Sequence, residues 1–394
     1  MHFSRDDIYI NSAHIFMDGL FDSIPIILTF MAIFYGAGEK DAGFVVSLGV
    51  LLSTVMGLSV KFFSRTCGLW RTLALVMLCA GMGFAGSAFC ASFGTGGAFL
   101  VLSVLGFGLF HNITFAHLST LAEQGRLGKT LGDFAAVGDI GRIPIASFAG
   151  FAAAFTLWGE PGWRGVSLLY GLVTIGFAGV LLLYARRTPT VRAGAEGKGG
   201  LLPSFALMRQ RPVALAMSTG VLDAFCSGHV FTFLPFLLFA KGIDPKVIGG
   251  FALAFTVGSF AGKALFGRLT GIYNARPVFV CAELLMGVLL LIMVLAQQLW
   301  LIIAASIALG VVTKGTMPVL HTLVVEPIKD SRQYEDIFSL TTLFRGGVSM
   351  VTPVLFGLLA AWASIEWVYA LMAVVAVLAV IPLFFINADT ADGV

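Results

Sequence analysis

Several ionisable side chains lie inside stretches that are otherwise apolar, and these are the first candidates for chemistry. His14, Asp18 and Asp22 stand four residues apart, so a helix would carry all three on one face. A charge at the centre of a bilayer costs at least about 2.5 kcal/mol, so such residues are kept for pairing or for function. We expect this face to accept protons or bind cations. The alternative is that the three groups hydrogen-bond to neighbouring helices.

Basic residues occur in other apolar stretches. Asp139 and Arg142 are three residues apart and can pair on one helix, which makes a structural role at least as probable as a functional one. Arg345 lacks such a local acid, and Lys314 has none three or four residues away, so each needs an acid on another helix or an anionic ligand. Asp223 and Asp18 are the candidate acids for this purpose.

Two histidines also fall inside apolar stretches, His111 and His229. An imidazole titrates near neutral pH, which suits proton transfer, whereas a lone histidine in a membrane helix is more often a packing residue. The sequence therefore gives one set of candidate substrate-binding or proton-coupling residues: His14, Asp18, Asp22, His111, Asp139, Arg142, Asp223, His229, Lys314 and Arg345.

A second hypothesis concerns metals. His14, Met17 and Asp18 would offer nitrogen, sulfur and oxygen ligands, a mixture that can bind transition metals or a metal chelate. Ligand spacing within one helix is not diagnostic, and Met17 lies off the main stripe, so this hypothesis ranks second.

Composition limits the class of protein. Of the 394 residues, 58% are hydrophobic and 11% are charged, and the mean hydropathy is +0.95. A soluble domain carries roughly a quarter charged residues, so this chain predicts a membrane protein. The net charge of +3 and the scattered basic residues do not indicate nucleic-acid binding. The five cysteines have no metal-site spacing, and no phosphate loop or nucleophile triad occurs, so we expect neither a cofactor nor an enzyme.

Apolar runs of about 20 residues predict helices that cross the bilayer. The first six are expected near 8–34, 42–62, 70–91, 97–120, 131–156 and 164–185. A polar stretch follows, and six more runs lie near 211–240, 247–267, 277–297, 299–325, 335–362 and 366–387. With the N-terminus placed in the cytoplasm, most Lys and Arg fall on the cytoplasmic side, which predicts that both termini are cytoplasmic.

The two halves of the sequence resemble each other. Spans four and five can be laid on spans ten and eleven with one gap, which aligns His117 with His321, Asp133 with Asp336, and Arg142 with Arg345. Six plus six spans with a long central linker resemble the major facilitator superfamily. The resemblance implies two rocking bundles with a substrate site near the membrane midplane. The superfamily's loop between spans two and three is degenerate here, because Lys61 to Arg71 lacks its acidic residue.

Short motifs are similar to the fosmidomycin-resistance-like branch of efflux proteins. They are Ser12-Ala-His14 followed by Asp18, Phe110-His111, and Ala136-Val-Gly138-Asp139-Ile-Gly141. This resemblance implies exchange of drugs or metabolites for protons, without naming a substrate.

The sequence therefore predicts an all-α membrane protein with 12 transmembrane helices in two pseudo-symmetric six-helix bundles. The expected domains are an N-terminal bundle over 1–186, a cytoplasmic linker over 187–206 and a C-terminal bundle over 207–394. We expect a monomeric secondary transporter in a bacterial inner membrane. Its expected partners are a small-molecule substrate, protons as the coupling ion and the lipid bilayer.

Overall fold

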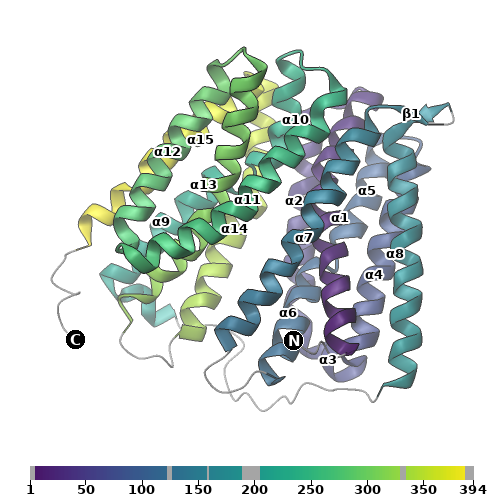
Figure 1. Ribbon diagram of the computed structural model, residues 1–394, viewed down its shortest axis with the longest axis horizontal. Helices are drawn as coiled ribbons and strands as arrows, with labels where there is room; N and C mark the ends of the chain where they lie inside the picture. The colour runs from purple at the N-terminus through teal and green to yellow at the C-terminus, as the bar shows by residue number, and fades with distance from the viewer. Residues whose placement is uncertain (1–4, 122–126, 158, 189–204, 329–333, 387–394) are drawn as a thin grey trace. The chain divides into compact units, whose positions relative to one another are not determined.

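The computed structural model describes residues 5–121, 127–157, 159–188, 205–328 and 334–386, and almost all of them are helical (Figure 1). The chain divides into two compact units. The first unit is Met1–Gly197 with Gly242–Leu253, and the second unit is Lys198–Lys241 with Ala254–Val394.

The first unit is built from helices and one short hairpin. In the unit, α4 packs along α8 and α1 packs along α7. Its elements are α1 (Arg5–Tyr35), α2 (Glu39–Leu58), α3 (Val60–Thr66), α4 (Gly68–Ala88), α5 (Phe93–Val104), α6 (Phe107–Leu121), α7 (Leu127–Ala153), the antiparallel strands β1 (Thr156–Leu157) and β2 (Glu160–Pro161), and α8 (Gly162–Arg187).

The second unit is entirely helical over its described residues. Within it, α12 packs on α13 and α15, and α9 packs on α14 and α15. Its elements are η1 (Phe205–Arg209), α9 (Arg211–Ser227), α10 (Val230–Ala240), α11 (Ile248–Ile272), α12 (Ala275–Leu295), α13 (Leu299–Val325), α14 (Tyr334–Trp362), α15 (Ile365–Ala379) and η4 (Ile381–Phe385). The short helix η2 (Pro245–Val247) and the first residues of α11 are counted with the first unit.

Eleven helical stretches of the described chain are long and apolar enough to cross a membrane, judged by length and composition. They coincide with eleven of the twelve expected spans. The remaining expected span corresponds to α7, a 27-residue helix that is less apolar because it carries Asp139 and Arg142 among other ionisable residues. The expected all-α, multi-pass membrane fold is confirmed.

Two of the expected spans are interrupted at a glycine. The span expected near 97–120 consists of α5 and α6, and the span expected near 211–240 consists of α9 and α10. Each interruption contains a glycine, Gly106 in the first and Gly228 in the second. Glycine destabilises a helix because its backbone loses more conformational freedom on folding than that of other residues. The sequence predicted continuous helices because their apolar composition does not change across these glycines.

Glycines let α1 and α7 approach each other closely. A Cβ atom on Gly141 of α7 would overlap the carbonyl oxygen of Ile15 in α1, and one on Gly19 would lie 2.8 Å from the carbonyl oxygen of Gly141. A Cβ on Gly138 would lie 2.5 Å from Asp18 Oδ2 and from His14 Nε2. Because Gly138 has no side chain, the side chains of His14 and Asp18 on α1 have the space that they occupy.

This close approach predicts that Gly141→Ala destabilises the protein. Overpacking a tight contact typically costs about 1–3 kcal/mol, so we expect a lower melting temperature in thermal unfolding of the purified protein in detergent. Gly176→Ala on the exposed face of α8 is the control, since no described atom lies within 4 Å of a Cβ there. Equal melting temperatures for the two variants would show that the α1–α7 contact is looser than the structure indicates.

Candidate functional site

Asp18 is the centre of a buried polar cluster in the first unit. The Nη2 of Arg142 lies 2.9 Å from Asp18 Oδ2, and the Nε of Arg142 donates to the same oxygen at 3.1 Å. His111 Nε2 lies 3.2 Å from Asp18 Oδ1, and His14 Nε2 lies 3.4 Å from Asp18 Oδ2. The Asp18 side chain is 4% exposed, so these contacts replace nearly all of its hydration. Helices α1, α6 and α7 each contribute to the cluster.

The contacts of His111 constrain where its protons lie. Its Nδ1 is 3.0 Å from the carbonyl oxygen of Phe107, which can only accept, so Nδ1 carries a hydrogen. A neutral imidazole then has a bare Nε2, and that atom faces both Asp18 Oδ1 and His14 Nε2, the latter at 3.2 Å. Two bare acceptors repel each other, so the contact between His111 and Asp18 is favourable only when a proton lies between them.

Arg142 also lies near two further carboxylates. Besides Asp18, its guanidinium lies 3.7 Å from an oxygen of Asp22 and 3.5 Å from an oxygen of Asp139. Asp18 and Asp22 belong to α1 and Arg142 belongs to α7, so these contacts hold the two helices together at more than one point.

Aromatic rings enclose the two histidines. The His14 ring stacks on Phe134 with ring centroids 3.9 Å apart, and the His111 ring lies 4.4 Å from the Phe107 ring. The His14 side chain is 2% exposed, whereas the His111 side chain is 19% exposed. His111 is therefore the more accessible member of the histidine pair.

The second unit contains a comparable pair between α9 and α14. The Nη1 of Arg345 lies 2.5 Å from Asp223 Oδ2 and also donates to the carbonyl oxygen of Gly220 at 2.7 Å. The hydroxyl of Thr316 in α13 donates to Asp223 Oδ1 at 3.1 Å. Asp223 is fully buried. The acid that Arg345 was expected to require is therefore Asp223, on another helix.

Glu283 of α12 is a buried acid that the sequence reasoning missed. It is 0% exposed, and the thiol of Cys226 lies 3.7 Å from its Oε2. Glu283 lies close enough to Asp223 and Arg345 to interact electrostatically with both. The signal was present, because Glu283 is the sole acidic residue in the apolar stretch expected near 277–297.

The two acid–arginine pairs occupy corresponding helices. Arg142 and Arg345 are aligned in the sequence repeat, and each binds an aspartate on the first long helix of its own unit, Asp18 on α1 and Asp223 on α9. The repeat alignment identified the arginines but not their partners. The side chains of Asp133 and Asp336, the other aligned acids, lie outside the described residues.

The remaining candidates are distributed as follows. His229 is buried, with Nε2 2.9 Å from the carbonyl oxygen of Ser349 and Nδ1 3.3 Å from the hydroxyl of Thr232, so both ring nitrogens have partners. Lys314 is half-buried on α13, near enough to His229 for an electrostatic interaction. Met17 is buried in the apolar core beside α4 rather than in the polar cluster.

Variants of Glu283 and Asp223 test which of these two buried carboxyl groups in the second unit is charged. Two fully buried carboxylates face one guanidinium, so we expect Glu283 to hold a proton and Asp223 to be ionised. Glu283→Gln should then leave stability nearly unchanged. Asp223→Asn should cost about 3–5 kcal/mol, because it leaves Arg345 without its anion. The measurement is thermal unfolding of each purified variant. An equal loss of stability in both variants would mean that Glu283 is ionised in the folded protein.

Comparison with known proteins identifies the fold. The sequence model of the Major Facilitator Superfamily matches residues 216–393 of this chain. No curated protein sequence is a significant match to the chain.

Solved structures resemble the chain over almost its full length. A bacterial homolog of the human lysosomal transporter Spinster, in an inward-facing and unoccupied conformation, is 15% identical with a TM-score of 0.70, covering 99% of this chain and 97% of that one. A mutant of the nucleoside transporter NupG is 12% identical with a TM-score of 0.76, covering 96% of this chain and 99% of that one. These are transporters, in agreement with the prediction that the chain is not an enzyme. The chain therefore has the fold of the major facilitator superfamily, and its residues 216–393 match that superfamily's sequence model.

Proposed function

We propose that the protein is a secondary active transporter that moves a small solute by alternating access and is coupled to protons. The fold and the match to the superfamily model support the transport class. The observation that carries proton coupling is the contact between His111 and Asp18, which requires a proton to be favourable. Cofactors have no role in the proposal.

The coupling step follows from this contact. With a proton on His111, the imidazolium donates to the carbonyl oxygen of Phe107 and forms an ion pair with Asp18, whose Oδ1 lies 3.2 Å from His111 Nε2, so α6 is bound to α1. Loss of the proton removes the attraction to Asp18 and leaves the contact of Asp18 with Arg142 in place. Proton occupancy thus selects between two strengths of the α1–α6 contact, which is the kind of two-state element that a transport cycle needs.

The proposed substrate class and direction of transport rest on sequence resemblance and on charge in the second unit. The resemblance of Ser12-Ala-His14, Phe110-His111 and the span-five motif to the fosmidomycin-resistance-like branch supports efflux of a drug-like molecule or an organic anion. Lys314 supplies positive charge in the second unit that an anionic group would recognise, whereas the charge of Arg345 is already paired with Asp223. We place the protein in a bacterial inner membrane, as a monomer with both termini in the cytoplasm.

A transport assay with two readouts tests the proton step. A thermal-shift screen of purified protein against drugs, organic anions and siderophores first selects the solute. In proteoliposomes, His111→Asn and Asp18→Asn should lose accumulation driven by a pH gradient by about a hundredfold or more, the lower end of what one proton-transfer group contributes. Exchange of labelled for unlabelled solute should persist, because it requires no net proton movement.

The control variant is Asp41→Asn, which changes an exposed carboxylate at the start of α2 that accepts a hydrogen bond from the Gly38 amide. It should retain both readouts, since the side-chain oxygen of asparagine can also accept the hydrogen bond from the Gly38 amide. Accumulation that is indifferent to the pH gradient in the unmodified protein would overturn proton coupling while leaving solute transport intact.

One observation favours a second candidate function. His14, Asp18 and His111 each offer a ligand atom, and these atoms lie within 4.8 Å of one another. A transition metal or a metal chelate is therefore the alternative cargo, with His111 in the place expected for Met17. The proposal ranks second because Arg142 already holds Asp18 Oδ2 at 2.9 Å and would repel a cation.

Calorimetry separates the two candidates. Titration of the purified protein with Zn²⁺ or Mn²⁺ at neutral pH should give no binding heat if the cluster carries protons. Heat that disappears in His14→Gln and His111→Gln would establish the metal site instead, since each variant removes one ligand nitrogen.

A further inference from the structure

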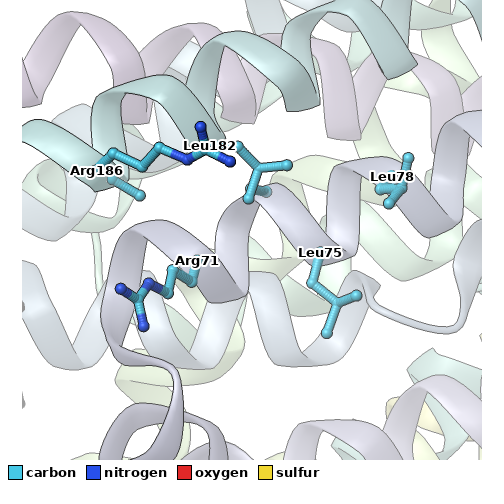
Figure 2. Close-up of a pocket in the computed structure, with 7 residues that line it drawn as sticks. Arg71, Leu75, Leu78, Leu182 and Arg186 are labelled. Atoms are coloured by element: carbon cyan, nitrogen blue, oxygen red, sulfur yellow. The ribbon is translucent and has the colours of Figure 1, made fainter.

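A groove lies between α4 and α8 in the first unit, away from the polar cluster. It has a volume of about 390 Å³, and its lining includes Arg71, Leu75 and Leu78 of α4 and Leu182 and Arg186 of α8. Figure 2 shows the three α4 residues following one another along their helix, with Leu182 and Arg186 on the neighbouring helix. Apart from the two arginines, the wall is apolar.

The two arginines differ from those inside the units. Arg142 and Arg345 are bound by carboxylates, whereas neither Arg71 nor Arg186 has an ion pair or side-chain hydrogen bond among the described residues. Both are exposed. Arg186 stands in the last turn of α8, where a positive charge suits the helix dipole. Arg71 stands in the first turn of α4, where the dipole disfavours it. Helix stability therefore does not account for Arg71.

The spacing of the lining residues gives the groove a charged end and an apolar remainder. On α4, Arg71, Leu75 and Leu78 follow at i, i+4 and i+7, and on α8, Leu182 and Arg186 are four residues apart, so each set shares one helix face. Leu75 and Leu182 are each 41% exposed. From Arg71 to Leu78 the face runs for about 10 Å at 1.5 Å per residue, a length that suits the upper part of an acyl chain.

We propose that this groove binds an anionic phospholipid. The phosphate lies between the guanidinium groups of Arg71 and Arg186, and an acyl chain lies along Leu75, Leu78 and Leu182. The first turn of α4 adds backbone N–H groups with no side-chain cap from Cys67, which also favours an anion. In the expected orientation, this end of the unit faces the cytoplasmic leaflet, where anionic lipids attract basic residues. The site does not depend on the proposed proton coupling.

Native mass spectrometry of the purified full chain tests the charged end. The protein is titrated with phosphatidylglycerol and, separately, with phosphatidylcholine. We expect tighter binding of phosphatidylglycerol, and we expect the double variant Arg71→Gln/Arg186→Gln to lose about 30-fold in affinity for it, given the attraction typical of two basic residues at a membrane surface. Melting temperatures show whether the variants remain folded.

The matched control removes two nearby charges that do not line the groove. Arg65→Gln/Arg187→Gln changes the net charge by the same amount at exposed positions on α3 and α8. It should retain phosphatidylglycerol binding within about twofold, whereas two lost site charges cost far more. An equal loss in both double variants, or a loss in neither, overturns the proposal, because the arginines would then contribute only general surface charge.

A second pair of variants tests the apolar wall. Leu182→Ala shortens a side chain in the groove, and Leu183→Ala shortens an adjacent exposed side chain outside it. Only the first should weaken phosphatidylglycerol binding several-fold, while sn-glycerol 3-phosphate at the same concentration should not displace the lipid. Displacement by that chain-free phosphate would show a site for soluble phosphate and overturn the assignment to phospholipid.

Discussion

In each unit, an arginine on one helix and an aspartate on another neutralise each other in an apolar interior. Arg142 binds Asp18 across α7 and α1, and Arg345 binds Asp223 across α14 and α9. Neither charge is stable alone at such a position, because desolvation costs several kcal/mol per ion. The pairs therefore fix which helices must be neighbours, and the polar groups around them are organised by that constraint.

The two pairs have acquired different surroundings. Two imidazoles and two further carboxylates surround the pair in the first unit. In the second unit the pair is accompanied by Thr316 and Glu283, which offer a hydroxyl and one carboxylate in a fully buried setting. The polar surroundings of the first pair are therefore partly exposed, since the His111 side chain is 19% exposed, whereas those of the second pair are fully buried.

Small residues and polar chemistry depend on each other in this fold. Gly138 and Gly141 bring α7 against α1, and without that approach the Arg142 side chain would not reach Asp18. Van der Waals contact between closely approaching backbones is a principal source of helix association in lipid. Arginines at the surface of the first unit are stabilised in a different way. Arg71 and Arg186 remain exposed at a helix end, where water and lipid headgroups can satisfy them.

The membrane class and the span positions could be predicted from the sequence, because length and hydropathy alone decide whether a helix can cross a bilayer. Mid-span ionisable residues such as Asp18, Asp223 and Arg345 could be singled out for the same reason. Asp223 could be named as a candidate acid for Arg345, but the partners of Asp18 could not be predicted, since side chains on different helices meet only through tertiary packing. The contact of Asp18 with His111, 93 residues away in sequence, the burial of Glu283 beside Asp223, and the interruption before His111 were decided by the tertiary structure.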